Sequence, residues 1–108
     1  WDQVLGSYLR ERSSLAGIVL VIDIRRGLTD LDLQLAHWIA PTGRPVLVLL
    51  TKADKFAYGK RIQAVAAARK ELKEIGAVHA LPFSATHRLG LEDATLHIEN
   101  WISPQFVP

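Results

Sequence analysis

The stretch Val46-Leu47-Val48-Leu49-Leu50-Thr51-Lys52-Ala53-Asp54 is an unbroken apolar run followed by a polar tetrapeptide. Apolar residues that follow one another without alternation predict a parallel strand covered on both faces. In open α/β sheets, ligands bind just beyond the carboxyl ends of the strands. The pattern therefore predicts a ligand site at Thr51–Asp54. On the local pattern alone, Asp54 could instead cap a following helix.

Strands and helices are predicted to alternate around this stretch, which indicates an α/β fold with a three-stranded parallel sheet. Leu31 and Ile62 are expected on the core-facing sides of their helices, and Pro82 indicates an edge strand. The two further strands are expected at Gly17–Ile22 and His79–Phe83. The four helices are expected before Ser13, from the N-cap Thr29 to Pro41, from a loop at Tyr58-Gly59 to Gly76, and from Gly90 to Ser103.

The composition limits the kinds of site and partner that this chain can have. The chain has 108 residues, 49% of them hydrophobic, with a net charge of +2 that does not favour nucleic acid by itself. The absence of cysteine excludes disulfides, thiolate metal sites and cysteine catalysis, and favours the cytoplasm. No apolar run approaches the thickness of a bilayer, so no membrane partner is expected. Without Met, and opening on Trp1, the chain is expected to be part of a longer domain.

Two of the three predicted strands end in polar segments, Thr51–Asp54 and Ser84–Thr86, which adjacent parallel strands would bring together. The carboxylate of Asp54 can accept two parallel N–H bonds, from N1 and the 2-amino group of guanine, a donor pair that adenine lacks. The backbone N–H of Ala85 can donate to the 6-oxo group. The segments therefore predict a guanine site, in which the Lys52 stem lies along the ring and Thr51 ties the two loops together.

The tetrapeptide Thr51-Lys52-Ala53-Asp54 resembles the base-recognition motif of Ras-like GTPases, Asn/Thr-Lys-x-Asp, and Ser84-Ala85-Thr86 resembles their last motif. The wider pattern is similar to one branch of these TRAFAC-class proteins, the ribosome-biogenesis GTP-binding family EngB, also called YihA or YsxC. The residues that carry this resemblance are Tyr8–Arg12, Leu20–Leu28, Asp32, Leu49–Lys55 and Phe83–Ala85.

The resemblance implies a three-layer P-loop NTPase-like fold that binds GTP and GDP. It also implies a cytoplasmic GTPase that acts in assembly of the large ribosomal subunit and in cell division (septation), with that subunit or its rRNA as partner. The residues expected to bind the guanine base are Thr51, Lys52, Asp54, Phe83, Ser84, Ala85 and Thr86.

The chain departs from the family in one respect. It contains neither the Gly-x-x-x-x-Gly-Lys-Ser/Thr loop that cradles phosphates nor the Asp-x-x-Gly motif. Residues 1–108 are therefore expected to be the carboxyl-terminal half of a single GTPase domain, with an incomplete sheet whose exposed edge could drive self-association. Mg²⁺ is expected to bind through the absent segments, and no catalytic or metal-binding residue is expected in this half.

Two alternatives remain open at this stage. A receiver-like α/β domain would use Asp23 as its phosphoacceptor, although Asp23 with Arg25 is better interpreted as a turn-stabilising pair. A non-enzymatic docking module would use the basic helix Lys60–Lys73. The four histidines show no metal-ligand spacing, and His87 adjoins the second motif, where it could border the ribose.

Overall fold

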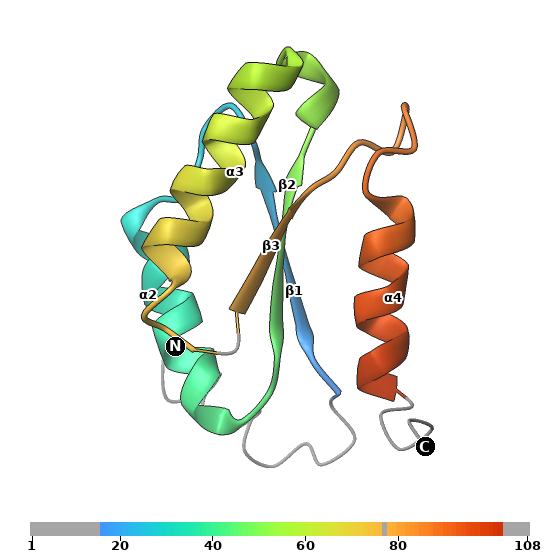
Figure 1. The fold of residues 1–108 in the computed structure, drawn as a ribbon. Coiled ribbons are helices and arrows are strands. Elements are labelled where there is room, and N and C mark those ends of the chain that lie inside the picture. The colour runs from blue at the N-terminus through green and yellow to red at the C-terminus, as the bar shows by residue number, and fades with distance from the viewer. Residues whose placement is uncertain (1–15, 77, 103–108) are drawn as a thin grey trace.

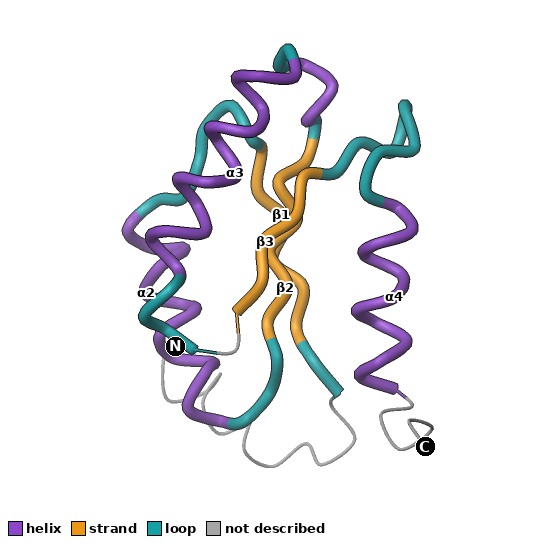
Figure 2. Tube along the Cα trace, in the orientation of Figure 1, coloured by secondary structure: helices purple, strands orange, loops and turns teal. Residues whose placement is uncertain are grey.

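The computed structural model describes residues 16–76 and 78–102, which form a parallel sheet with helices on both faces (Figure 1). The strands β1 (Ile18–Asp23), β2 (Val46–Thr51) and β3 (Val78–Pro82) are paired in the order β1-β2-β3. Helices α2 (Asp30–Ile39) and α3 (Tyr58–Leu72) cover one face, and α4 (Leu91–Ile102) lies over the other (Figures 1 and 2). The predicted α/β architecture is confirmed, while the helix expected before Ser13 lies outside the described residues.

Strand β2 is the centre of the sheet because it pairs with a parallel neighbour on each side. Val48 lies opposite Leu20 of β1 and Ala80 of β3. Its unbroken apolar sequence is what such a position requires, since both of its faces are covered. The largest fully buried side chains of the described residues include Val46, Leu47, Val48 and Leu50.

Helix α2, which with α3 covers the core on one face of the sheet, begins with a capping box. The Thr29 hydroxyl accepts from the backbone N–H of Asp32 at 3.3 Å, and the Asp32 carboxylate accepts from the backbone N–H of Thr29 at 2.9 Å. This capping box satisfies two backbone donors that the first turn would otherwise leave unpaired, which confirms Thr29 as the N-cap. From α2 and α3 the core takes Ala36, Ile39, Val65, Ala68 and Leu72.

Several helix details differ from the sequence-based expectation. Leu31 is 54% exposed, because the buried stripe of α2 is centred on Ala36 and Ile39, with Leu31 outside it in the first turn. Ile62 is 50% exposed, because it lies where α3 passes the outer edge of the sheet. Helix α3 starts directly at Tyr58 and ends at Leu72, and Gly76, with φ of 111°, turns the chain into β3.

The last helix is also less covered than its pattern predicts. Leu91 and Ile98 are 39% and 36% exposed, whereas Ala94 is buried. The far end of α4 packs closely on the start of β1, where a Cβ atom added to Gly17 would clash with the indole ring of Trp101. A glycine is therefore needed at position 17 for this approach.

Strand β1 is well covered on one face and only partly covered on the other, although its unbroken apolar sequence predicts a strand buried on both faces. Ile22 belongs to the core under α2 and α3, but Val19 and Val21, which point to the other face, are 36% and 67% exposed. Within residues 16–76 and 78–102, no strand pairs with the outer edge of β1. An unpaired apolar edge of this kind is a template for pairing with another chain.

We therefore expect the isolated 108-residue chain to self-associate at micromolar concentration, which sedimentation velocity over a concentration series will detect. Val21→Lys should shift the chain toward monomer, because a charge on an exposed strand opposes pairing between edges. Gln63→Lys, which adds the same charge on the exposed side of α3, is the control and should leave the association unchanged. A wild-type monomer at all concentrations would contradict this expectation.

Candidate functional site

The loop that follows β2 leaves the strand through a sharp turn. Lys52 adopts the left-handed conformation (φ 56°, ψ 34°), after which Ala53–Lys55 form one turn of 3₁₀-helix. The backbone N–H of Ala53 donates to the carbonyl of Phe83 at 3.1 Å. This bond fixes the tetrapeptide to the segment that follows β3, as the parallel pairing of the two strands predicts.

The loop that follows β3 is closed on itself. Ser84 and Leu89 exchange two backbone hydrogen bonds, of 2.9 and 3.0 Å, and Ala85 and Thr86 stand exposed at the tip between them. The next residue, Gly90, has φ of 75°, and a Cβ atom there would clash with the carbonyl of Pro82. Only glycine adopts this positive φ readily and has no Cβ atom to clash, so the loop geometry depends on Gly90.

Asp54 and Ser84 meet where the two loops converge. The buried Ser84 hydroxyl donates to Asp54 Oδ1 at 2.7 Å, while Asp54 Oδ2 lies 3.6 Å from Nδ1 of His87. The Ser84 bond holds the pKa of Asp54 below its usual range, and the charges of His87 and Lys55 act in the same direction. Asp54 is thus an ionised, acceptor-only group whose side chain is 16% exposed.

The other predicted site residues lie around this pair. Lys52 is exposed, and within the described chain the backbone N–H of Ala85 makes no hydrogen bond, so it is free to donate. Thr51 departs from expectation: its hydroxyl donates to the carbonyl of Ile22 at 3.2 Å. Thr51 therefore ties β2 to β1, and the two loops are joined by the Ala53 amide and by Ser84 instead.

Arg61 has a role that the sequence did not reveal, since its position in the basic helix predicts a solvated side chain. Its Nε donates to the carbonyl of Ala53 at 3.2 Å and its Nη2 to the carbonyl of Phe56 at 3.4 Å. Arg61 thereby satisfies two carbonyls of the loop that carries Asp54. The only sequence signal was a cation in the first turn of the helix that follows the motif.

Asp23, at the carboxyl end of β1, is fully engaged by Arg25. The backbone N–H and Nε of Arg25 donate to Oδ1 at 2.9 and 3.1 Å, and Nη2 donates to Oδ2 at 2.7 Å. These bonds hold the pKa of Asp23 well below its usual range. Both oxygens are occupied by one guanidinium, which confirms the turn-stabilising pair and disfavours a phosphoacceptor.

The described residues contain neither a metal-binding cluster nor a membrane-spanning helix. Across 16–76 and 78–102, no cluster of three or more His, Asp or Glu side chains is arranged to hold a metal ion. The helices of this part of the chain include none that is long and apolar enough to cross a bilayer.

The chain shares its fold with solved structures of GTP-binding proteins. It superimposes with a TM-score of 0.72 on translation elongation factor SelB from Methanococcus maripaludis in complex with the GTP analogue GppNHp, at 13% identity over 95% of this chain and 24% of SelB. It superimposes with a TM-score of 0.70 on the crystal structure of a probable GTP-binding protein EngB, at 18% identity over 95% of this chain and 66% of that protein.

Sequence comparison relates the chain to proteins of one name. The chain is 67% identical along its whole length to the probable GTP-binding protein EngB of Bordetella pertussis, and 42% identical over 105 residues to that of Thiobacillus denitrificans. It spans about half the length of these curated relatives, 52% and 51%. No protein-family model matches it. The resemblance to the EngB family is thus confirmed, and the chain corresponds to the carboxyl-terminal half of its members.

The bond between Ser84 and Asp54 leads to a test by pH. A carboxyl group with a lowered pKa stabilises the fold above its ordinary value of 3.8, and this stability is lost as the pH falls through the folded-state pKa. Ser84→Ala should raise the pKa of Asp54 toward 3.8 and shrink the loss of stability in acid. Carboxyl ¹³C NMR titration and unfolding between about pH 1 and pH 5, the range over which such stability is lost, measure both effects.

Thr95→Ala is the matched control, because it removes a hydroxyl that bonds only the carbonyl of Leu91 within α4. The control should leave the titration of Asp54 unchanged. An unaltered Asp54 titration in Ser84→Ala would mean that the serine does not hold the carboxylate.

Proposed function

We propose that this chain supplies the guanine-recognition part of a GTP-binding GTPase domain. The observation that carries the proposal is the ionised Asp54 carboxylate, fixed by the buried Ser84 hydroxyl at the carboxyl edge of the sheet. Open α/β sheets bind ligands at this edge. The names of the matching Bordetella and Thiobacillus proteins, which describe them as probable GTP-binding proteins, support the same assignment.

In this proposal Asp54 accepts the N1–H and 2-amino hydrogens of guanine. Adenine presents no donor pair at these positions, so the carboxylate selects the base. The free N–H of Ala85 donates to the 6-oxo group, which is an amino group in adenine. The acceptor carboxylate of Asp54 and the donor N–H of Ala85 thus face one edge of the ring, and both favour guanine over adenine.

The remaining residues position this pair and cover the ring. The exposed Lys52 lays its aliphatic stem along one face of the base. Thr51 ties the start of the first loop to β1 through its hydroxyl bond to Ile22, and Phe83 joins the two loops through its carbonyl bond to Ala53. The Thr86 hydroxyl lies 3.3 Å from that of Ser84 and shapes the tip of the second loop.

The phosphates and Mg²⁺ of GTP or GDP are assigned to other segments of the whole protein, because this sequence contains no phosphate-binding loop. The whole protein is proposed to hydrolyse GTP in the cytoplasm during assembly of the large ribosomal subunit, with that subunit or its rRNA as partner. This part of the proposal rests on the resemblance to the EngB family.

Asp54→Asn in the complete protein should move base preference from guanine toward xanthine. The asparagine keeps one acceptor but presents an amide donor, which matches the 2-oxo group of xanthine and opposes the 2-amino group of guanine. Loss of one charge-assisted bond should weaken GTP binding by about 10- to 100-fold. Competition of GTP, XTP and ATP against a fluorescent guanine nucleotide measures the change.

Asp93→Asn is the matched control, since it makes the same substitution on an exposed residue of α4 and should leave all three affinities unchanged. Unchanged GTP affinity in Asp54→Asn, with no gain for XTP, would return Asp54 to a purely structural role in its loop.

The isolated chain should bind guanosine, GDP and GTP with similar affinity, because only the base would be contacted. Contacts to a base alone correspond to a dissociation constant of about 1 mM or weaker. Saturation-transfer NMR and titration calorimetry are suited to dissociation constants in this range. The isolated chain is not expected to hydrolyse GTP. Micromolar binding of GTP but not of guanosine would reveal a phosphate site within these 108 residues.

A further inference from the structure

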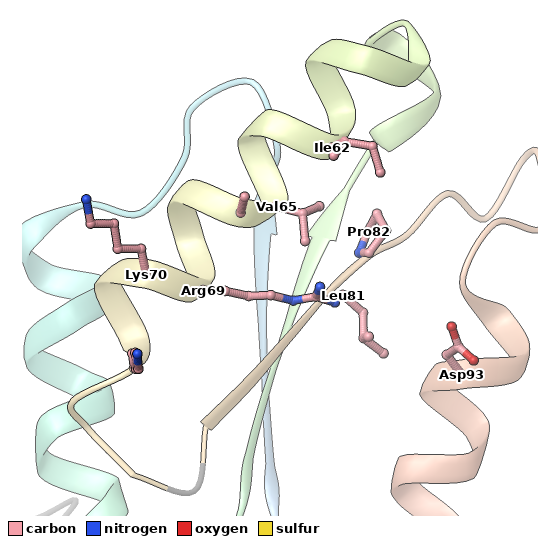
Figure 3. A pocket seen from close by; sticks show the side chains of 9 residues that line it. Ile62, Val65, Arg69, Lys70, Leu81, Pro82 and Asp93 are labelled. Atoms are coloured by element: carbon pink, nitrogen blue, oxygen red, sulfur yellow. The ribbon is translucent and has the colours of Figure 1, made fainter.

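A groove of about 770 Å³ runs along the outer edge of β3, between α3 and α4 (Figure 3). Its floor is apolar and is formed by Val65, Leu81 and Pro82, with Ile62 at one end (Figure 3). The lining includes none of the residues assigned to the guanine site. The groove therefore provides a second surface that the nucleotide would leave open.

The exposure of Ile62 distinguishes this groove from ordinary surface. Single exposed apolar side chains are common, but Ile62 is half exposed directly beside the buried Val65 and above the apolar residues of β3. The apolar surface is thus continuous and concave rather than scattered. A continuous concave surface of this kind can hold apolar side chains of another molecule in van der Waals contact.

Several backbone groups on the edge of β3 are unavailable to another strand. The carbonyl of Ala80 accepts from Arg69 Nε at 3.0 Å, the N–H of Val78 donates to the carbonyl of Gly76 at 2.7 Å, and Pro82 has no N–H. An extended peptide that added to this edge would leave its own backbone groups unpaired. A helix satisfies its backbone internally and can place side chains on an apolar floor without that cost.

The charges of the groove are strongly asymmetric. Arg69 and Lys70 of α3, with Lys73 at the C-cap of that helix, line one side of the groove, the α3 wall. Asp93 of α4 lies on the other side (Figure 3). Within the described part of the chain, none of the three cations forms an ion pair. A partner that covers the groove must therefore bring acidic side chains to the α3 wall.

The lining disfavours single-stranded RNA as the occupant, because it contains no aromatic side chain on which a base could stack. Phosphates could meet Arg69, Lys70 and Lys73, but a phosphate backbone would leave the apolar floor uncovered. An occupant with both apolar and acidic side chains fits the floor and the wall together.

We propose that this groove docks an amphipathic helix of a partner protein, whose apolar stripe lies on Ile62, Leu81 and Pro82 and whose flanking acidic residues face Arg69 and Lys73. This inference goes beyond guanine recognition, because it involves no residue of that site. Loss of docking would leave base selectivity intact, so the two proposals can fail separately.

Site-specific photo-crosslinking in the complete protein, in living cells, tests this proposal. A benzophenone amino acid at position 62 should crosslink to one segment of one protein, identified by mass spectrometry as an acidic amphipathic helix. If that substitution destabilises the fold, the exposed Ala66 in the same groove takes its place. A crosslink to RNA, to a second copy of this chain, to a segment without acidic residues, or to nothing from both positions would overturn the proposal.

Charge reversal then tests the fit. A synthetic peptide of the crosslinked segment should bind the Lys73→Glu variant about tenfold more weakly than wild type, and replacing the facing acid of the peptide by lysine should restore binding. Lys60→Glu is the control, because Lys60 is on the same helix but outside the groove. Equal binding to both variants, or failure of the reversed peptide to restore binding, would contradict helix docking in this orientation.

Discussion

The parallel pairing of β2 with β3 is the constraint on which the candidate site depends. It brings the ends of two strands, separated by about thirty residues of chain, to the same edge of the sheet, where the Ala53 amide bonds the Phe83 carbonyl and Ser84 bonds Asp54. Each loop alone would leave buried polar groups unpaired. Together they satisfy these groups and turn a flexible carboxylate into a fixed, ionised acceptor.

The two outer strands of the described sheet have opposite chemistry. At β3, Arg69 and Pro82 close the edge, so that the apolar surface beside it is suited to side-chain contacts. At β1, the backbone edge has no strand partner within residues 16–76 and 78–102, and Val21 is exposed beside it. The sheet can therefore grow on one side only. The candidate site, the open edge of β1 and the apolar groove beside β3 therefore occupy separate parts of the described chain.

Similarity of fold and similarity of sequence relate this chain to different sets of proteins. At 13–18% identity to SelB and to a crystallised EngB protein, the arrangement of strands and helices is still shared, which shows that many sequences satisfy it. The 67% identity to a Bordetella protein extends along every element of this chain. Sequence identity therefore distinguishes this chain's relatives among the proteins that share its fold.

The sequence by itself determined the element order, the central position of β2, the capping box at Thr29 and the residue types of the candidate site. These depend on local patterns: an unbroken apolar run, a capping motif, and polar residues at strand ends. The tertiary structure alone decided that Thr51 bonds β1, that Arg61 holds the Asp54 loop and that Ile62 is exposed in a groove. These facts depend on which segments meet across the sheet, because periodicity gives the face of a helix but not what covers it.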